Sequence, residues 1–151
     1  PPKYDDKFVG VGDALRPQFN LSKQVATERA RVEVARAVET TVNSSLNDHM
    51  QASGMGMEAG ATEFTESVSK SLVSTTLKGC TIEKTEIFKE RVFVMVTYDA
   101  KKARDEAKAF ARVLAKKEES LFNEFKARNA FDSLDKAIDR MKGSSSVAKP
   151  E

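Results

Sequence analysis

The chain has 151 residues, of which 32% are charged and 40% hydrophobic, and its formal net charge is +2. This length predicts a single domain, and no segment offers the roughly 18 consecutive apolar residues that a transmembrane helix requires. Acidic and basic residues are interspersed, so we expect no one-sided basic surface and no nucleic-acid partner. Cys80 is the only cysteine, which excludes an intrachain disulfide and any cysteine-based zinc site.

The first half of the chain predicts a short strand followed by two helices. Residues 1–7 are expected to form a flexible lead-in, and the sequence FVGVGDA at 8–14 favours a strand whose glycines permit a bulge or close packing. Residues 22–52 carry an apolar stripe at helical spacing. The glycine-rich segment 53–61 interrupts this pattern, and a second helix is expected at 62–79. The stripe of the first helix comprises Ala35, Val38, Val42, Leu46 and Met50.

The second half predicts a hairpin and then one long helix. The sequence RVFVMVTYD at 91–99 is apolar on both faces, which is typical of a central strand, whereas the preceding strand carries more charge and should be its exposed neighbour. The pair Lys89–Glu90 is the expected turn. Residues 100–142 contain neither Gly nor Pro and predict a continuous helical rod about 60 Å long, with one slip in apolar spacing between Phe125 and Phe131.

These elements predict an α+β protein with a small, mostly antiparallel, three-stranded sheet packed with helices in the order β-α-α-β-β-α. We expect an α+β module at 8–111, an extended C-terminal helix at 112–142 and a polar tail at 143–151. The first part of this long helix can pack on the sheet, whereas the second part must project, fold back onto its own domain or meet another chain.

No motif in the sequence predicts catalysis or cofactor binding. Gly10 and Gly12 resemble the start of a dinucleotide-binding turn, but Leu15 stands where the third glycine should be and Pro17 interrupts the helix that should follow. His49 is the only histidine and lacks further metal ligands, so a structural role is expected. A nucleophilic Cys80 would need His49 as its base, and no motif brings them together. We therefore expect no cofactor, no metal and no enzymatic activity.

The strongest functional pattern lies on the C-terminal helix. Its large apolar side chains would form an exposed stripe on a solvated rod, and such stripes mark association surfaces. Two methionines in the glycine-rich segment are candidate contacts of the same kind because methionine adapts to varied partners. The predicted interaction residues are Phe122, Phe125, Phe131, Leu134 and Ile138 on the helix, with Met55 and Met57 in the segment 53–61.

Three segments together resemble a known family. The sequences SKQVATERARVEVARAVETTV at 22–42, KERVFVMVTYDAKKARDEAK at 89–108 and FVGVGDA at 8–14 are similar, in order and spacing, to the LPP-twenty family of small bacterial outer-membrane lipoproteins. The resemblance covers about residues 8–111, and the extension at 112–142 departs from it. It implies a compact α+β module without enzymatic activity, located in the periplasm on the outer membrane.

The family resemblance also implies partners. Its members include a flagellar motor protein that builds rings or a disk beneath the outer membrane, and a lipid anchor is expected on a cysteine upstream of Pro1. The resulting hypothesis is a periplasmic structural protein that forms a homo-oligomeric ring or disk, with other flagellar motor proteins as further partners. The alternative is a monomeric surface lipoprotein that binds a ligand or a partner protein, and a hydrolase using Cys80 and His49 is a third possibility.

Overall fold

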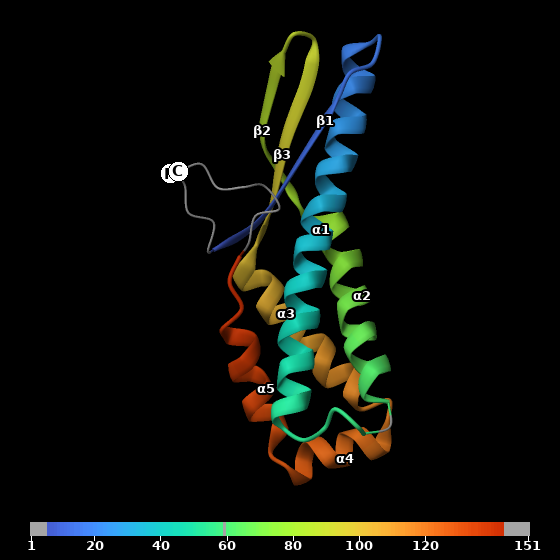
Figure 1. The fold of residues 1–151 in the computed structure, drawn as a ribbon, viewed down its shortest axis with the longest axis vertical. Helices are drawn as coiled ribbons and strands as arrows, with labels where there is room; N and C mark the ends of the chain where they lie inside the picture. Colours follow the sequence, from blue (N-terminus) through green and yellow to red (C-terminus); the bar gives the residue numbers. More distant parts are fainter. Residues whose placement is uncertain (1–5, 59, 144–151) are drawn as a thin grey trace.

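The computed structural model describes residues 6–58 and 60–143 and has an α+β fold. The elements follow in the order β1 (Lys7–Ala14), α1 (Phe19–Ala52), α2 (Ala61–Gly79), β2 (Thr81–Phe88), β3 (Arg91–Asp99), α3 (Ala100–Ala115), α4 (Glu119–Ala127) and α5 (Ala130–Asp139). The molecule is elongated, with the sheet at one end and a helical bundle at the other (Figure 1). The 34-residue helix α1 runs through both parts.

The sheet has the strand order β1-β3-β2 with antiparallel pairing throughout, so β3 is the central strand as its apolar sequence predicted. Val92, Val94 and Val96 alternate along β3 and are buried on the face that packs against α1. The two outer strands differ in burial. The helix α1 packs along β1, as it does along β3, whereas every residue of β2 is exposed. The sheet therefore has one covered face and one uncovered edge strand.

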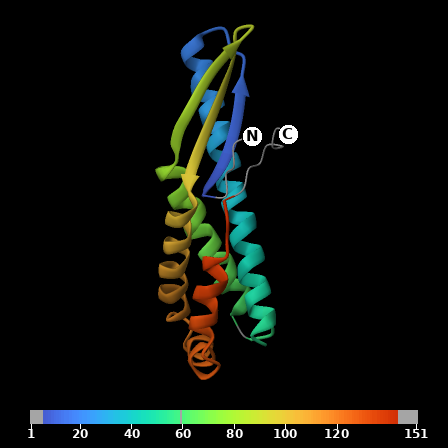
Figure 2. The same cartoon turned by 90° about the vertical axis from the view of Figure 1, so that its left-hand side faces the viewer.

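The hairpin turn consists of Lys89 and Glu90, as expected, and both have positive φ values of 49° and 68°. Positive φ at both central residues defines a type I′ turn, which suits the twist of a two-residue hairpin. Such turns usually contain Asn or Gly, because a Cβ atom makes the left-handed conformation unfavourable. Here two charged residues adopt it at the tip of the hairpin, at one end of the molecule (Figure 2).

The expected C-terminal rod is wrong, because the chain after Asp99 forms three helices instead of one. The chain leaves α3 at Lys116 and turns again at Asn129, whose φ of 52° lies in the left-handed region that Asn tolerates better than most residues. The helix α4 crosses the end of the bundle and α5 returns beside α3 (Figure 1). The second corner coincides with the slip in apolar spacing between Phe125 and Phe131.

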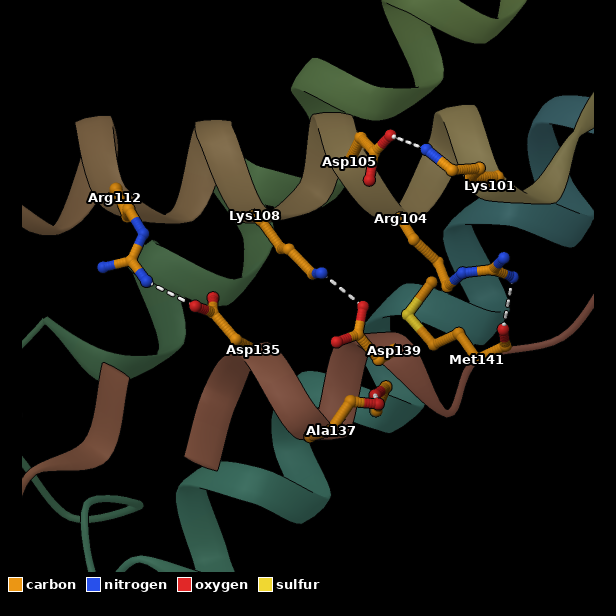
Figure 3. Close-up of polar contacts among 10 residues, drawn as sticks. Lys101, Arg104, Asp105, Lys108, Arg112, Asp135, Ala137, Asp139 and Met141 are labelled. Carbon is orange, nitrogen blue, oxygen red and sulfur yellow. Dashed lines mark hydrogen bonds and ion pairs between the residues drawn. The ribbon is translucent and has the colours of Figure 1, made fainter. Parts of the chain in front are cut away.

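Charged side chains hold the returning helix α5 against α3. Lys108 and Arg112 of α3 form ion pairs with Asp139 and Asp135 of α5 respectively, and Arg104 donates to the backbone oxygen of Met141 at 2.9 Å (Figure 3). The face of α3 that is buried consists entirely of alanines, which allow neighbouring helices to lie close. The C-terminal segment is therefore part of one helical bundle rather than a projection from it. These alanines are Ala100, Ala103, Ala107, Ala111 and Ala115.

Candidate functional site: an exposed edge strand

The glycine pair of β1 serves packing rather than phosphate binding. Gly10 and Gly12 lie in the middle of the strand, on the side that faces α1. A Cβ atom at Gly10 would lie 2.4 Å from the backbone oxygen of Ala30, and one at Gly12 would lie 2.2 Å from that of Ala26. Both distances are far shorter than a van der Waals contact, so only glycine permits this approach of strand and helix.

His49 lies at the C-terminal end of α1, where it faces the returning helices α4 and α5. The side chain is 6% exposed and its ring stacks on that of Phe125, with a centroid distance of 6.4 Å. Its Nε2 atom lies 2.9 Å from the hydroxyl of Ser133 and 3.1 Å from that of Ser53. Burial lowers the pKa of the imidazole below its ordinary value, although a backbone hydrogen bond to Ala130 opposes this. A lowered pKa favours the neutral form of this imidazole, in keeping with the structural role expected for His49.

The surroundings of His49 form an open cavity of about 620 Å³ between α1 and α5. Hydroxyl groups of Ser45, Ser53 and Ser133 line it together with Arg128 and Arg140. Arg128 is already engaged, because it pairs with Glu124 and Glu58 and donates to the backbone oxygen of Ser53. The cavity is polar and accessible, and the imidazole meets two of its serine hydroxyls, but among the described residues no side chain bonds the Nδ1 atom of His49 to orient the ring as a base.

Cys80 lies between α2 and β2 and does not meet His49. Its thiol is 3.8 Å from the backbone oxygen of Leu77, and burial raises the pKa of the thiol. A thiol with a raised pKa is a poor nucleophile at neutral pH. The two residues of the hydrolase hypothesis thus sit in separate environments.

The predicted interaction residues of the C-terminal segment are mostly buried within the chain itself. Phe125, Leu134 and Ile138 are at most 1% exposed, and Phe122 and Phe131 are partly buried against the same core. The expectation that this stripe has no room in its own molecule is wrong, because the turns after α3 and at Asn129 fold it back onto α1 and α3. The rings form one cluster, in which Phe125 stacks on Phe131 at 4.7 Å and contacts Phe64 of α2.

The two methionines of the glycine-rich segment have opposite environments. Met55 is fully buried in the core, whereas Met57 is 97% exposed. Met55 thus closes the end of the bundle, and of this pair only Met57 presents an apolar surface to solvent.

The strand β2 is exposed along its whole length, as its charges predicted, although the sequence did not single it out as a candidate site. All eight of its residues are exposed, and its apolar side chains Ile82, Ile87 and Phe88 are 44%, 57% and 65% exposed. An edge strand presents unpaired backbone N–H and C=O groups, which form a template for pairing with another strand. The charges in TIEKTEIF keep this strand outside the hydrophobic core, but they do not reveal that one of its edges has no partner strand.

Further exposed apolar side chains belong to elements that lie at the same end of the molecule as the hairpin tip, as the ribbon in Figure 1 shows for those elements. They belong to the connection between β1 and α1 and to the first turn of that helix. Leu15, Phe19 and Leu21 are between 43% and 49% exposed. Clustered exposed apolar side chains are more informative than single ones, because they mark surfaces that associate.

Comparisons and further searches give no independent assignment of function. No model of a known protein family matches the chain, and no curated protein matches it either. Within the ranges 6–58 and 60–143, no three His, Cys, Asp or Glu residues are grouped so that they could hold a metal ion. No helix in the described part of the chain is long and apolar enough to cross a membrane.

Proposed function

We propose that this protein is a non-enzymatic structural protein that self-associates through the uncovered edge of its sheet. The observation that carries the proposal is the exposure of β2 along its whole length, with its own apolar side chains Ile82, Ile87 and Phe88 facing solvent. Pairing with another strand would satisfy the backbone groups of this edge. The association surface thereby differs from the one expected from sequence, which was the C-terminal helix.

The non-enzymatic part of the proposal is supported by the surroundings of the chemically most reactive side chains. His49 is neutral and hydrogen-bonds two serine hydroxyls, while Cys80 is a thiol with a raised pKa. Among the described residues, no side chain bonds Nδ1 of His49 to orient the ring as a base, and the Cys80 thiol donates to the backbone oxygen of Leu77 rather than to a base.

The location and the assembled form follow from the family resemblance of the segments at 8–14, 22–42 and 89–108. We place the protein in the periplasm, attached to the outer membrane by a lipid anchor upstream of residue 1. The assembly is a ring or disk, in its most concrete form a scaffold of the flagellar basal body, and it needs further surfaces besides the edge strand, because edge-to-edge pairing of the same strand in two copies closes at a dimer. An elongated subunit with an exposed strand at one end is compatible with lateral association.

Sedimentation velocity of the purified chain, from low to high micromolar concentration, tests self-association. We expect the mean sedimentation coefficient to rise with concentration, and negative-stain images at the upper end to show particles larger than one subunit. A single monomeric species at every concentration would contradict the proposal. A truncation after Lys116 is not a suitable test, because it removes α4 and α5 and exposes the core.

A second candidate function, a monomeric surface lipoprotein that binds a ligand, is favoured by the polar cavity around His49. Its volume of about 620 Å³ lies in the range typical of small-molecule sites. In that case the protein should remain monomeric, and small polar molecules should shift the NMR signals of the single imidazole. A monomer whose imidazole signals do not respond would leave neither function supported.

A further inference from the structure

We propose that two copies of this chain pair antiparallel through β2, around a two-fold axis at Thr85, to form a continuous six-stranded sheet. This inference rests on the proposed function and names its partner, a second copy, and its register. The proposed register is based on the order of charges in β2, where Lys84 and Glu86 flank Thr85 symmetrically. A two-fold axis at Thr85 places each Lys84 opposite Glu86 of the other copy, twice in the same interface.

Neighbouring registers are disfavoured by the same charges. Residues paired across antiparallel strands point to the same face, so the register can shift only in steps that preserve the face of each side chain. A two-fold axis at Lys84 would oppose two ammonium groups, and one at Glu86 would oppose two carboxylates. Like charges directly opposite each other destabilise a sheet, whereas unlike charges stabilise it. Among these three registers, the one centred on Thr85 alone brings unlike charges together.

Lys84 and Glu86 are also the charged groups of β2 that remain free to meet a partner. Glu83, the third, is held within its own sheet, because its carboxylate accepts from Lys7 at 2.9 Å and from Thr97 at 3.1 Å. Glu83 lies at the bulge in the β2–β3 pairing, between Ile82 and Lys84. Lys84 and Glu86 contact each other at 3.3 Å, with side chains 65% and 64% exposed, so their ion pair is solvated and readily exchanged for contacts between copies.

No other element of the described chain blocks this edge. The helix α1 packs on β1 and β3, and β2 lies beyond it at the margin of the sheet (Figure 1). Charged side chains on an edge strand ordinarily prevent pairing, because most registers bring like charges together. In β2 the same charges select one register and reject its neighbours.

A charge exchange tests the pairing between copies. Lys84→Glu puts carboxylates at both positions 84 and 86, and Glu86→Lys puts ammonium groups at both, so each variant alone should sediment as a species at least twofold smaller than the wild-type assembly. An equimolar mixture of the two should associate again, because every contact in the mixed pair is then between unlike charges. The double variant K84E/E86K should also associate. A mixture that stays as small as its components would overturn the proposal, and unchanged circular dichroism would exclude misfolding as the cause.

Cysteine crosslinking tests the register in a Cys80→Ser background. Thr85→Cys places two thiols at the axis, where the Cα atoms of paired strands lie within disulfide range, and mild oxidation should give a covalent dimer. Ile87→Cys is the matched control, since it lies on the same face of the same exposed strand. In the proposed register its two copies are four positions apart, about 13 Å, and should not crosslink.

The results of sedimentation and crosslinking distinguish failure of the proposed register from failure of the proposed self-association. If the wild-type chain assembles but Thr85→Cys does not crosslink, or Ile87→Cys crosslinks more readily, the register proposed here is wrong while self-association stands. If the wild-type chain is monomeric at every concentration, both proposals fail.

Discussion

Gly12 and Ala26 are in direct backbone contact, so close that a Cβ atom on Gly12 would lie 2.2 Å from the carbonyl oxygen of Ala26. One turn further along α1, Gly10 has the same relationship with Ala30. The strand and the helix thus meet without intervening side chains. This contact fixes how α1 lies across the sheet and which strand it leaves uncovered.

Gly12→Ala should destabilise the protein by about 3 kcal/mol, because the added methyl group meets helix backbone that cannot move aside. The free energy of unfolding, measured by urea denaturation, checks this. Gly56→Ala is the matched control, since a Cβ atom there meets the mobile amide end of Gln51. The control should change stability by no more than about 0.5 kcal/mol. Equal effects of the two substitutions would show that the close contact is absent.

Phe125→Ala should lower the free energy of unfolding by about 3–5 kcal/mol, because the side chain is fully buried and lies against Phe64, Phe131 and His49. The same truncation at Val113, which is 57% exposed, should change it by less than about 0.5 kcal/mol. Chemical denaturation measures both. A stable Phe125→Ala variant that has lost only its ability to assemble would instead favour the projecting helix expected from sequence.

Acidification should destabilise the wild-type protein more than the His49→Gln variant. Because burial lowers the pKa of His49 in the folded state, the unfolded chain takes up a proton first as the pH falls below about 6.5. Stability is therefore greatest when the imidazole is neutral and falls with pH until the folded pKa is passed. Gln is chosen because its amide can hydrogen-bond Ser53 and Ser133 in place of Nε2.

The measurement for His49 is the difference between the urea midpoints of the two proteins from neutral pH to pH 5. Carboxylates titrate in both proteins, so the difference isolates the histidine. A difference that does not change with pH, or one that grows in favour of the wild type on acidification, would contradict a buried neutral imidazole.

Tyr98→Phe should destabilise the protein by about 1–3 kcal/mol, because the buried phenolic hydroxyl donates to the carboxylate of Glu106. Burial and this carboxylate both raise the pKa of the phenol above its ordinary value. An absorbance titration at alkaline pH should accordingly show one of the two tyrosines ionising late, and this component should disappear in the variant. Glu106→Gln should bring the ionisation to lower pH, and an unshifted titration would contradict the contact.

Local patterns of apolar residues in the sequence predicted the first helix and the central strand. The apolar stripe through Val38 and Val42 located α1, and the run RVFVMVTYD located the central strand. The corner at Asn129 could not be read in this way, because it contains neither Gly nor Pro. It is stabilised by contacts of Arg128 with Glu58 and with the backbone of Ser53, which are about 70 residues away in the chain. The spacing slip before Phe131 was the only local sign of the turn.

One part of the candidate site could be predicted from the sequence, and the other part depends on the tertiary structure. The charges of β2 predicted an exposed strand, and exposure is what the structure shows. That the strand has a free edge depends on the strand order β1-β3-β2, because β1 pairs with β3 and not with β2, and sequence patterns do not specify this order. Burial of the aromatic cluster is likewise a tertiary property, so the apolar spacing of Phe125 and Leu134 alone could not distinguish a self-packed helix from an intermolecular one.

The turn at Lys89 and Glu90 offers a direct route to a more heat-resistant version of this protein. Both residues adopt a left-handed conformation that costs each of them about 1 kcal/mol compared with glycine. Replacing the pair with Asn-Gly would relieve that strain at the far tip of the hairpin and leave Lys84, Thr85 and Glu86 untouched. The melting temperature could thus be raised without altering the edge through which copies are proposed to join.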